Sequence, residues 1–338
     1  MNTVIPLDGM PTIVEMTKVK VSDLVLDIGN PRIQYYLDTR IKNSITIEEI
    51  ELAIAESNEQ FPRLKEHIEQ NGGIYNAIWV IRQNDGRFRV IEGNTRALIY
   101  SELGVKYINE PKWKVIDSYI LPSAVERKKI NFIRLEAHLF GPTPWDAYEK
   151  ARELYRLNSE EDYSIQRLQQ LTKLGAYEIK NNIQAFKDME EQYFPVYKKP
   201  GEQLKFSYFA EFRKNKDLRK LVQDGKLTLE QFCDLVGEGK FKRGEDVRRL
   251  AKVWKDEEAR DVLIDENMEE ALSQLAQKDP AAKSKLFEKM RDVSNGIETM
   301  PFGELDEIKS GLQPAKVNEL IRLKKVVSKL LNQIGVVG

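Results

Sequence analysis

The chain has 338 residues, 41% of them hydrophobic and 32% charged, which predicts a globular protein of two or three domains with sizeable cores. Its 53 basic and 54 acidic residues give a net charge of −1, without the overall basic excess of many nucleic-acid binders. One cysteine and two histidines exclude a disulfide framework and the usual zinc clusters, and the lack of a signal-peptide pattern or long apolar run predicts a cytoplasmic protein with no metal site and no membrane partner.

The N-terminal residues are expected to form an arm, a strand and a turn. Residues 1–20 are interpreted as an arm or edge strand, and a strand over residues 19–26 leads into Asn30-Pro31-Arg32. Pro31 fixes its own φ and disfavours a helical Asn30, so a turn is predicted here. Such a turn would hold Arg32 in a defined direction, either toward an anion or in a structural salt bridge.

Two helices and a hairpin are predicted next. Residues 46–59 and 61–70 carry apolar side chains at helical spacing, and the first of these segments starts with a capping box. Residues 77–82 and 88–91 are short apolar runs, joined by Asp85-Gly86. Because glycine tolerates the positive φ of a type I′ turn, this dipeptide predicts an antiparallel hairpin.

A glycine loop follows the second strand of the hairpin. Residues 92–96 read EGNTR, a helix is predicted over residues 97–103, and Gly104 is expected to end it. The first N–H groups of a helix have no internal partner and attract anions, and Arg96 adds a guanidinium fork. This stretch is therefore a candidate phosphate site, and an ordinary hairpin with a helix cap is the alternative.

A further strand over residues 113–120 leads into a helix expected from Leu121 to Leu139. Asn131, Arg134 and His138 lie at i, i+3 and i+7, so they share one face of that helix. An amide, a guanidinium and an imidazole on one face could hold phosphates or a metal-bound nucleotide. A solvated helix face is the alternative interpretation.

The segment Phe140-Gly141-Pro142-Thr143-Pro144 is expected to separate an N-terminal domain from a helical remainder. Within that remainder, residues 164–186 have the pattern of a helix-turn-helix, with Lys173 at the place where a turn glycine is usual. An ordinary helical hairpin in a bundle is the alternative. The predicted DNA-contacting side chains, which we expect to be exposed, are Lys173, Tyr177, Lys180, Asn181 and Gln184.

Charge is segregated along the helical half. Residues 198–220 hold eight basic and three acidic residues, and residues 238–255 hold seven and three. Residues 256–270 hold eight acidic residues and one arginine. This distribution predicts a local positive patch on a nearly neutral protein, with ordinary solvated helix faces as the alternative. The last predicted helix, over residues 314–334, is amphipathic and could pack on its own chain or on a second copy.

Four short segments resemble the boxes of one family in that family's order. FRVIEGNTRALIYSELG, residues 88–104, resembles the second box of the ParB N-terminal domain, where a strand runs into a G-E-R-R loop and a helix. Asn30-Pro31-Arg32 resembles the first box, and residues 72–80 resemble the segment G-[LIV]-x-x-P-I-V-V. Asn131-Phe132-Ile133-Arg134 is similar to the third box, E-N-x-Q-R. Asn94, Thr95, Ile130 and Ile133 depart from the charged or polar residues of the family pattern.

The resemblance implies an α+β N-terminal domain of the ParB/sulfiredoxin-like fold followed by an all-α C-terminal region. It implies an arm at 1–20, a nucleotide- or phosphate-binding domain at 21–140, a helical DNA-binding region at 145–235, and a C-terminal helical region at 236–338 that could dimerise. The implied ligand residues are Arg32, Gly73, Ile74, Gly93, Asn94, Thr95, Arg96, Asn131 and Arg134.

The implied function is that of a ParB-like DNA-binding protein with a CTP or ATP site, Mg²⁺ and a homodimer, of the kind used in partition, regulation or defence. The alternative from a different class is an NTPase or nuclease of this fold, in which Glu92 and Glu136 are the candidate carboxylates. A non-catalytic partner protein that has lost nucleotide binding is the third hypothesis, favoured by Thr95 and Ile130. Sulfiredoxin-like chemistry is excluded because the loop holds no cysteine.

Overall fold

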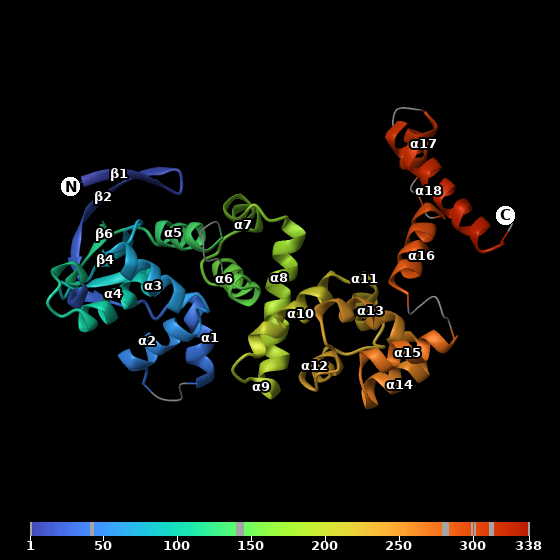
Figure 1. Cartoon of the computed structure of the whole chain (residues 1–338), viewed down its shortest axis with the longest axis horizontal. Helices are drawn as coiled ribbons and strands as arrows, with labels where there is room; N and C mark the ends of the chain where they lie inside the picture. The colour runs from blue at the N-terminus through green and yellow to red at the C-terminus, as the bar shows by residue number, and fades with distance from the viewer. Residues whose placement is uncertain are drawn as a thin grey trace. The chain divides into compact units, whose positions relative to one another are not determined.

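The computed structural model describes residues 2–40, 44–139, 145–278, 284–298, 300, 302–310 and 314–336. They form two compact units, Met1–Lys255 and Asp256–Gly338. The first contains one six-stranded sheet followed by helices, and the described part of the second is helical, so the expected α+β domain followed by an all-α region is confirmed (Figure 1). The break predicted at residues 140–144 lies outside the described residues. No helix in the described ranges has the length and apolar character needed to span a membrane.

The sheet has the strand order β1-β2-β6-β4-β5-β3 and mixes parallel and antiparallel pairs. Its strands are β1 (Asn2–Leu7), β2 (Met10–Lys20), β3 (Leu24–Val25), β4 (Ile78–Arg82), β5 (Phe88–Glu92) and β6 (Val115–Leu121). The β4–β5 hairpin is antiparallel, and β4 runs parallel to β6. Residues 2–20 form an edge hairpin, since β1 pairs only with β2 and β2 continues into β6.

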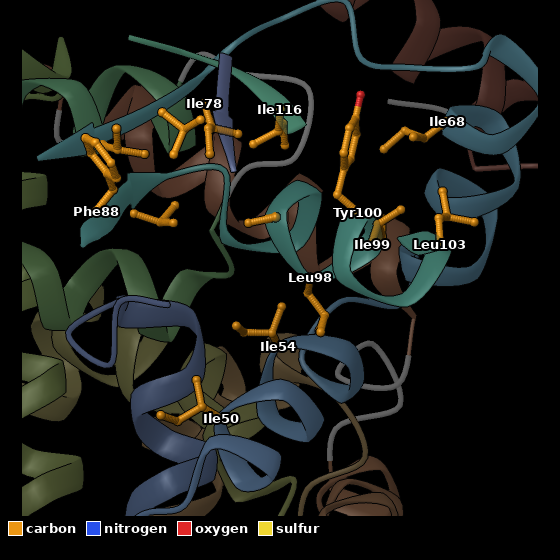
Figure 2. Close-up of a cluster of buried hydrophobic side chains, with 14 of the residues drawn as sticks. Ile50, Ile54, Ile68, Ile78, Phe88, Leu98, Ile99, Tyr100, Leu103 and Ile116 are labelled. Carbon is orange, nitrogen blue, oxygen red and sulfur yellow. The ribbon is translucent and has the colours of Figure 1, made fainter. Parts of the chain in front are cut away.

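The two faces of the sheet are covered by different helices, as the period-two alternation of a strand requires. One face packs against α1 (Pro31–Arg40), α2 (Ile47–Glu56), α3 (Phe61–Asn71) and α4 (Asn94–Lys106). In Figure 2, Leu98 of α4 points toward Ile54 of α2, and Tyr100 stands beside Ile68 of α3. The other face packs against α5 (Arg127–Leu139), whose Ile130 and Ile133 meet strand residues such as Ile91.

Several predicted boundaries shift for identifiable reasons. Pro31 starts α1 rather than a turn, because proline is compatible with the first helical position. The hairpin has positive φ at Gly86 alone, with Gln83 accepting from the Gly86 N–H, so it is a three-residue loop and not a type I′ turn. Gly104 does not end α4 but lets Trp113 approach, since a Cβ there would lie 3.4 Å from the Trp113 carbonyl oxygen. β6 extends through Leu121, which delays α5 to Arg127.

The helical part of the first unit continues to Lys255. Its elements are α6 (Ala147–Ser159), α7 (Ile165–Thr172), α8 (Ala176–Asp188), the π-helical turn η3 (Met189–Tyr193), α9 (Phe194–Tyr197), the short 3₁₀ turn η4 (Glu202–Lys205), α10 (Phe206–Lys214), α11 (Lys216–Gln223), α12 (Leu229–Gly237) and α13 (Gly244–Lys255). The 3₁₀ turns η1 (Val21–Asp23) and η2 (Pro111–Lys114) belong to the preceding domain. Because α13 packs on α10 and α11, the unit extends past residue 235, where a boundary was expected.

The second unit contains α14 (Glu257–Asp265), α15 (Met268–Lys278), α16 (Lys285–Glu298), α17 (Phe302–Lys309) and α18 (Pro314–Gln333). Helices α14 and α15 pack on each other around Ala259, Leu263 and Ala271, each of which is fully buried. The predicted C-terminal helix over residues 314–334 is present as α18, and its described residues are not buried in this chain.

Gly93 connects β5 to α4 with φ +97°, and a Cβ at this position would lie 2.5 Å from Ile78 Cγ2. Gly86 also has a positive φ, +86°, but a Cβ on Gly86 would meet no atom within 4 Å. We therefore expect Gly93→Ala to lower the free energy of unfolding by about 2–4 kcal/mol, from left-handed strain plus overpacking. Gly86→Ala, the matched control, should cost only about 1 kcal/mol. Urea unfolding of both variants measures this, and equal losses would show that the Ile78 contact is relieved.

Candidate functional site

A cavity of about 570 Å³ opens where the glycine loop meets the start of α4. Seven of the residues predicted to bind a nucleotide lie in its lining: Arg32, Gly73, Ile74, Gly93, Asn94, Thr95 and Arg96. They come from α1, the segment before β4, and the β5–α4 connection. Hereafter this space is called the loop cavity. Its size is within the range of small-molecule sites, about 300–1,000 Å³.

The N-terminus of α4 belongs to the wall of the loop cavity. Ala97 donates the first backbone hydrogen bond of the helix, to the Gly93 carbonyl, at 2.9 Å. The backbone N–H groups of Asn94, Thr95 and Arg96 therefore come before the first hydrogen bond within the helix. The helix dipole adds partial positive charge beside them. This is the local arrangement predicted from the sequence, and it favours an anion.

Arg96 is only 18% exposed and is held by three contacts. Its guanidinium pairs with Glu92 and donates to the carbonyl oxygens of Asn76, at 2.5 Å, and Ala77, at 3.4 Å. Arg96 thus faces the loop cavity with its charge already paired, because the loop carries its own counterion four residues earlier. A ligand anion would have to share or displace Glu92.

Asn94 and Arg134 are linked through one buried residue, Asp27. The Asp27 N–H donates to Asn94 Oδ1 at 2.8 Å, and the Asp27 carboxylate pairs with Arg134. Asp27 is 3% exposed and Asn94 is 4% exposed. Asn94 thus has a structural role at the first position of α4 that sequence reasoning did not find.

Asn131 and Arg134 line a second cavity, of about 950 Å³, between the sheet domain and helices α6 and α8. This space is called the junction cavity below. Arg96 and Arg134, which the resemblance puts in one ligand set, do not share a site. Their guanidiniums line different cavities, and they pair with Glu92 and Asp27 respectively. Asn131, Arg134 and His138 do lie on one helix, α5, as predicted. Of these three residues, only His138 lines the loop cavity.

The two candidate carboxylates differ in their position. Glu92 lines the loop cavity and pairs with Arg96, whereas Glu136 is exposed and lies outside the lining of that cavity. In the described residues no group of three or more His, Cys, Asp or Glu side chains could hold a metal ion. The described residues therefore do not fit a Mg²⁺ ion held by the protein alone.

Sequence reasoning missed an aromatic pair in the loop cavity. The ring centroids of Trp79 and Tyr119 lie 4.8 Å apart, and both residues line the cavity together with the glycine loop. Trp79 is on β4 and Tyr119 is its parallel partner on β6. Only strand pairing brings them together, although alternation along each strand could have placed both on one face.

The predicted DNA-contacting residues lie on or just before α8. Lys173, Tyr177, Lys180 and Gln184 are not buried, and Lys173 adopts the left-handed conformation, with φ +61°, expected of the turn position. Asn181 is 8% exposed, so its predicted exposure is wrong. α8 packs between α6 and α10, and Asn181 lies on the same side as the buried Ala185 and Asp188.

A basic side chain from residues 198–220, that of Arg219, lies beside the exposed side of α8. Arg219 donates to the Tyr177 hydroxyl at 2.5 Å, and its guanidinium carbon lies 5.6 Å from the Tyr177 ring centroid. Lys214 and Lys216 belong to the same segment. The bidentate pair of Arg213 with the buried Asp188 fixes α10, and with it this basic segment, against α8.

Comparisons with known proteins give distant structural likeness only. No protein-family model matches the chain, and no curated protein matches it. Among solved structures, the C-terminally truncated chromosome-partitioning protein ParB from Caulobacter crescentus, complexed to the centromeric parS site, is similar with 12% identity and a TM-score of 0.35, over 70% of this chain and 98% of that chain. The same protein complexed with CTP-γ-S is similar with 11% identity and a TM-score of 0.24, over 72% and 99%.

Arg32 also lies near two carboxylates at the start of α6, of which Glu149 is buried and Asp146 is half-buried. Asp146 and Glu149 form a capping box, in which Glu149 accepts from the Asp146 N–H at 2.9 Å. Burial and the neighbouring Asp146 charge raise the pKa of Glu149 to about 7, while Arg32 opposes the shift. A carboxyl group whose folded pKa is raised favours the folded state at low pH, and that contribution is lost as the pH rises from about 4.5 through 7.

We expect Glu149→Gln to be more stable than the parent chain at pH 8, by about 1–3 kcal/mol, because Gln preserves the capping box without a buried charge. At pH 5, where Glu149 is protonated, the two proteins should have nearly equal stability. Thermal unfolding followed by circular dichroism at both pH values measures the difference. Parallel pH dependence of the two proteins would contradict the assigned pKa shift.

Proposed function

We propose that this protein binds a nucleotide in the loop cavity and DNA along α8, as a ParB-like nucleotide- and DNA-binding protein. The observation that carries the nucleotide half is the convergence of seven predicted ligand residues, from three separate segments, on one cavity that includes a helix N-terminus. Nothing in local sequence requires Arg32, Gly73 and Arg96 to meet.

The arrangement supports a phosphate chain at the start of α4. The amides of residues 94–96 and the Arg96 guanidinium would offset its charge, and Arg32 on α1 stands in the same lining. Gly93 supports this role because its positive φ turns the chain sharply from β5 into α4. The base would lie toward Gly73 and Ile74, where the Tyr100 hydroxyl accepts from the Ile74 N–H at 3.2 Å and fixes the backbone.

Glu92 sets the affinity of this site by competing with the ligand. Its carboxylate occupies Arg96 and adds negative charge beside the expected phosphates. The alternative function, nucleotide hydrolysis, needs Glu92 to act on water or on a nucleotide-bound cation after Arg96 has turned to the phosphates. The two hypotheses predict opposite effects of neutralising Glu92 on binding and turnover.

The nucleotide proposal is tested by thermal-shift titration with CTP, ATP and GTP, with and without Mg²⁺. One nucleotide should raise the unfolding midpoint by mass action. Glu92→Gln should bind it several-fold more tightly, and Arg96→Ala should weaken binding at least tenfold, since a charge-assisted hydrogen bond contributes about 1.5–3 kcal/mol.

Arg82→Ala is the matched control, because Arg82 is exposed on β4 and lies outside the lining of the loop cavity. The Arg82→Ala variant should bind the nucleotide with the same affinity as the parent chain. The absence of any nucleotide-dependent shift in the parent chain would remove the nucleotide half of the proposal. If Glu92→Gln binds normally but loses release of inorganic phosphate, the enzyme alternative replaces simple binding.

The DNA half of the proposal is supported by the outward side chains of α8 and its basic neighbours. Tyr177, Lys180 and Gln184 follow helical spacing along one stripe, and Arg219 lies against Tyr177. Lysine and arginine contact phosphates without sequence preference, while glutamine is suited to base edges. The Glu178 carboxylate lies next to this stripe and repels the phosphates of DNA. We therefore expect α8 to attract DNA only moderately.

We expect Lys180→Ala to weaken DNA binding on all sequences and to reduce the slope of log affinity against log salt by about one unit. Fluorescence anisotropy with a labelled duplex at several salt concentrations measures both effects. Lys128→Ala is the control, since Lys128 is an exposed lysine on α5, outside α7 and α8. An equal effect of the two substitutions, or no binding at low salt, would refute a DNA surface on α8.

A further inference from the structure

A small apolar pocket opens at one edge of the sheet domain, beside β3. Its volume is about 140 Å³, and eight of its eleven lining residues are aliphatic side chains from the segment 21–26, α2 and α4. This space is called the edge pocket below. It shares no lining residue with the loop cavity or the junction cavity, so it is separate from the proposed nucleotide site.

The floor of the edge pocket belongs to the main hydrophobic core of the sheet domain. Ile50 of α2 and Leu98 of α4 are buried in that core and line the pocket (Figure 2). Ile47, the first residue of α2, lines the same space but is 67% exposed. A large aliphatic side chain that stays in water beside an open apolar space favours a partner that covers both.

The edge pocket lies beside an edge strand. β3 pairs in parallel with β5, and its other side pairs with no strand among the described residues. An edge strand leaves backbone N–H and C=O groups free to pair with another chain. Leu24 and Val25, the two residues of β3, both line the pocket. An extended segment beside β3 would therefore gain backbone hydrogen bonds and place a side chain in the pocket, as peptides do when they add to a sheet.

The charge in the lining of the edge pocket favours a cation. Glu51 lines the pocket and has no ion-pair partner among the described residues, whereas Arg87 of the same lining pairs with Asp85 at 2.7 Å. Burial and the charges of Glu48 and Glu102 raise the pKa of Glu51. The Glu51 carboxylate therefore attracts a basic side chain and repels the phosphate groups of nucleic acids and lipids.

We propose that the edge pocket is a docking site for an extended segment of a partner protein, which places one aliphatic side chain in the pocket and a lysine or arginine against Glu51. The volume of the pocket limits the first group, because a cavity of about 150 Å³ holds one benzene-sized group. Side chains alternate along an extended chain, so the basic residue belongs two positions from the aliphatic residue, on the same side of the segment.

The test is selection of peptides from a random library displayed on phage, with the full chain immobilised. The enriched peptides should share an aliphatic residue with a lysine or arginine two positions away. Ser101→Leu should abolish this enrichment, because Ser101 is half-buried and lines the pocket from α4, where a leucine would fill the space. No shared pattern, an acidic pattern, or the same enrichment with Ser101→Leu would overturn the proposal.

Fluorescence anisotropy with one selected, labelled peptide separates the two contributions. Replacing the aliphatic residue of the peptide by alanine should weaken binding at least about tenfold, because a buried side chain is lost. Glu51→Gln should weaken binding about two- to fivefold, as expected of a partly exposed ion pair. Glu56→Gln is the matched control, since Glu56 is an exposed glutamate of the same helix outside the lining of the edge pocket. Equal effects of the Glu51 and Glu56 changes would refute the contact with a cation.

Two further measurements make the result specific. If Ser101→Leu does not fold, Ile47→Ser replaces it, because Ile47 is exposed; this variant should bind the peptide several-fold more weakly, and unchanged affinity would refute the pocket. Sedimentation of the parent chain alone distinguishes a second copy from a different protein. A dimer of the parent chain that Ser101→Leu dissociates would show that the pocket binds a second copy, and would overturn the assignment to a partner protein.

Discussion

The sheet domain depends on one buried carboxylate, Asp27. Its backbone N–H holds Asn94 at the first position of α4, and its side chain accepts from Arg134 of α5 and from the Gly29 N–H at 3.2 Å. Three segments that are distant in sequence are thus joined at a residue that is 3% exposed. Removing one partner from such a buried pair costs about 3–5 kcal/mol, so the start of α4 and the position of α5 are set together.

Both cavities beside this carboxylate have the same electrostatic design. Each holds a guanidinium that is already neutralised within the protein, Arg96 by Glu92 and Arg134 by Asp27. An anion that bound Arg96 would have to displace Glu92 from it, which would lower the affinity and release that carboxylate. Glu92 lies on the loop itself, and Asp27 is the residue that positions the start of α4.

The helical region is organised around α8, which packs between α6 and α10. Its inward side is fixed by Phe186, Met189 and the pair of Asp188 with Arg213. Among its described residues, Tyr177, Lys180 and Gln184 are exposed and remain for contacts with another molecule, and Arg219 lies against Tyr177. The end of α8 and η3 also contribute Lys187 and Glu190 to the lining of the junction cavity.

Local patterns in the sequence were sufficient for features that depend on neighbours in the chain. The hairpin, the glycine turn before α4, the Thr46 capping box, the two helices over residues 164–186 and the left-handed Lys173 all follow from spacing and backbone chemistry. Only the tertiary structure decided which polar groups meet. Strand pairing brings Trp79 beside Tyr119, Asn181 is buried, and Arg134 pairs with Asp27 in a cavity separate from that of Arg96. These contacts join residues up to about a hundred positions apart, so no local spacing in the sequence encodes them.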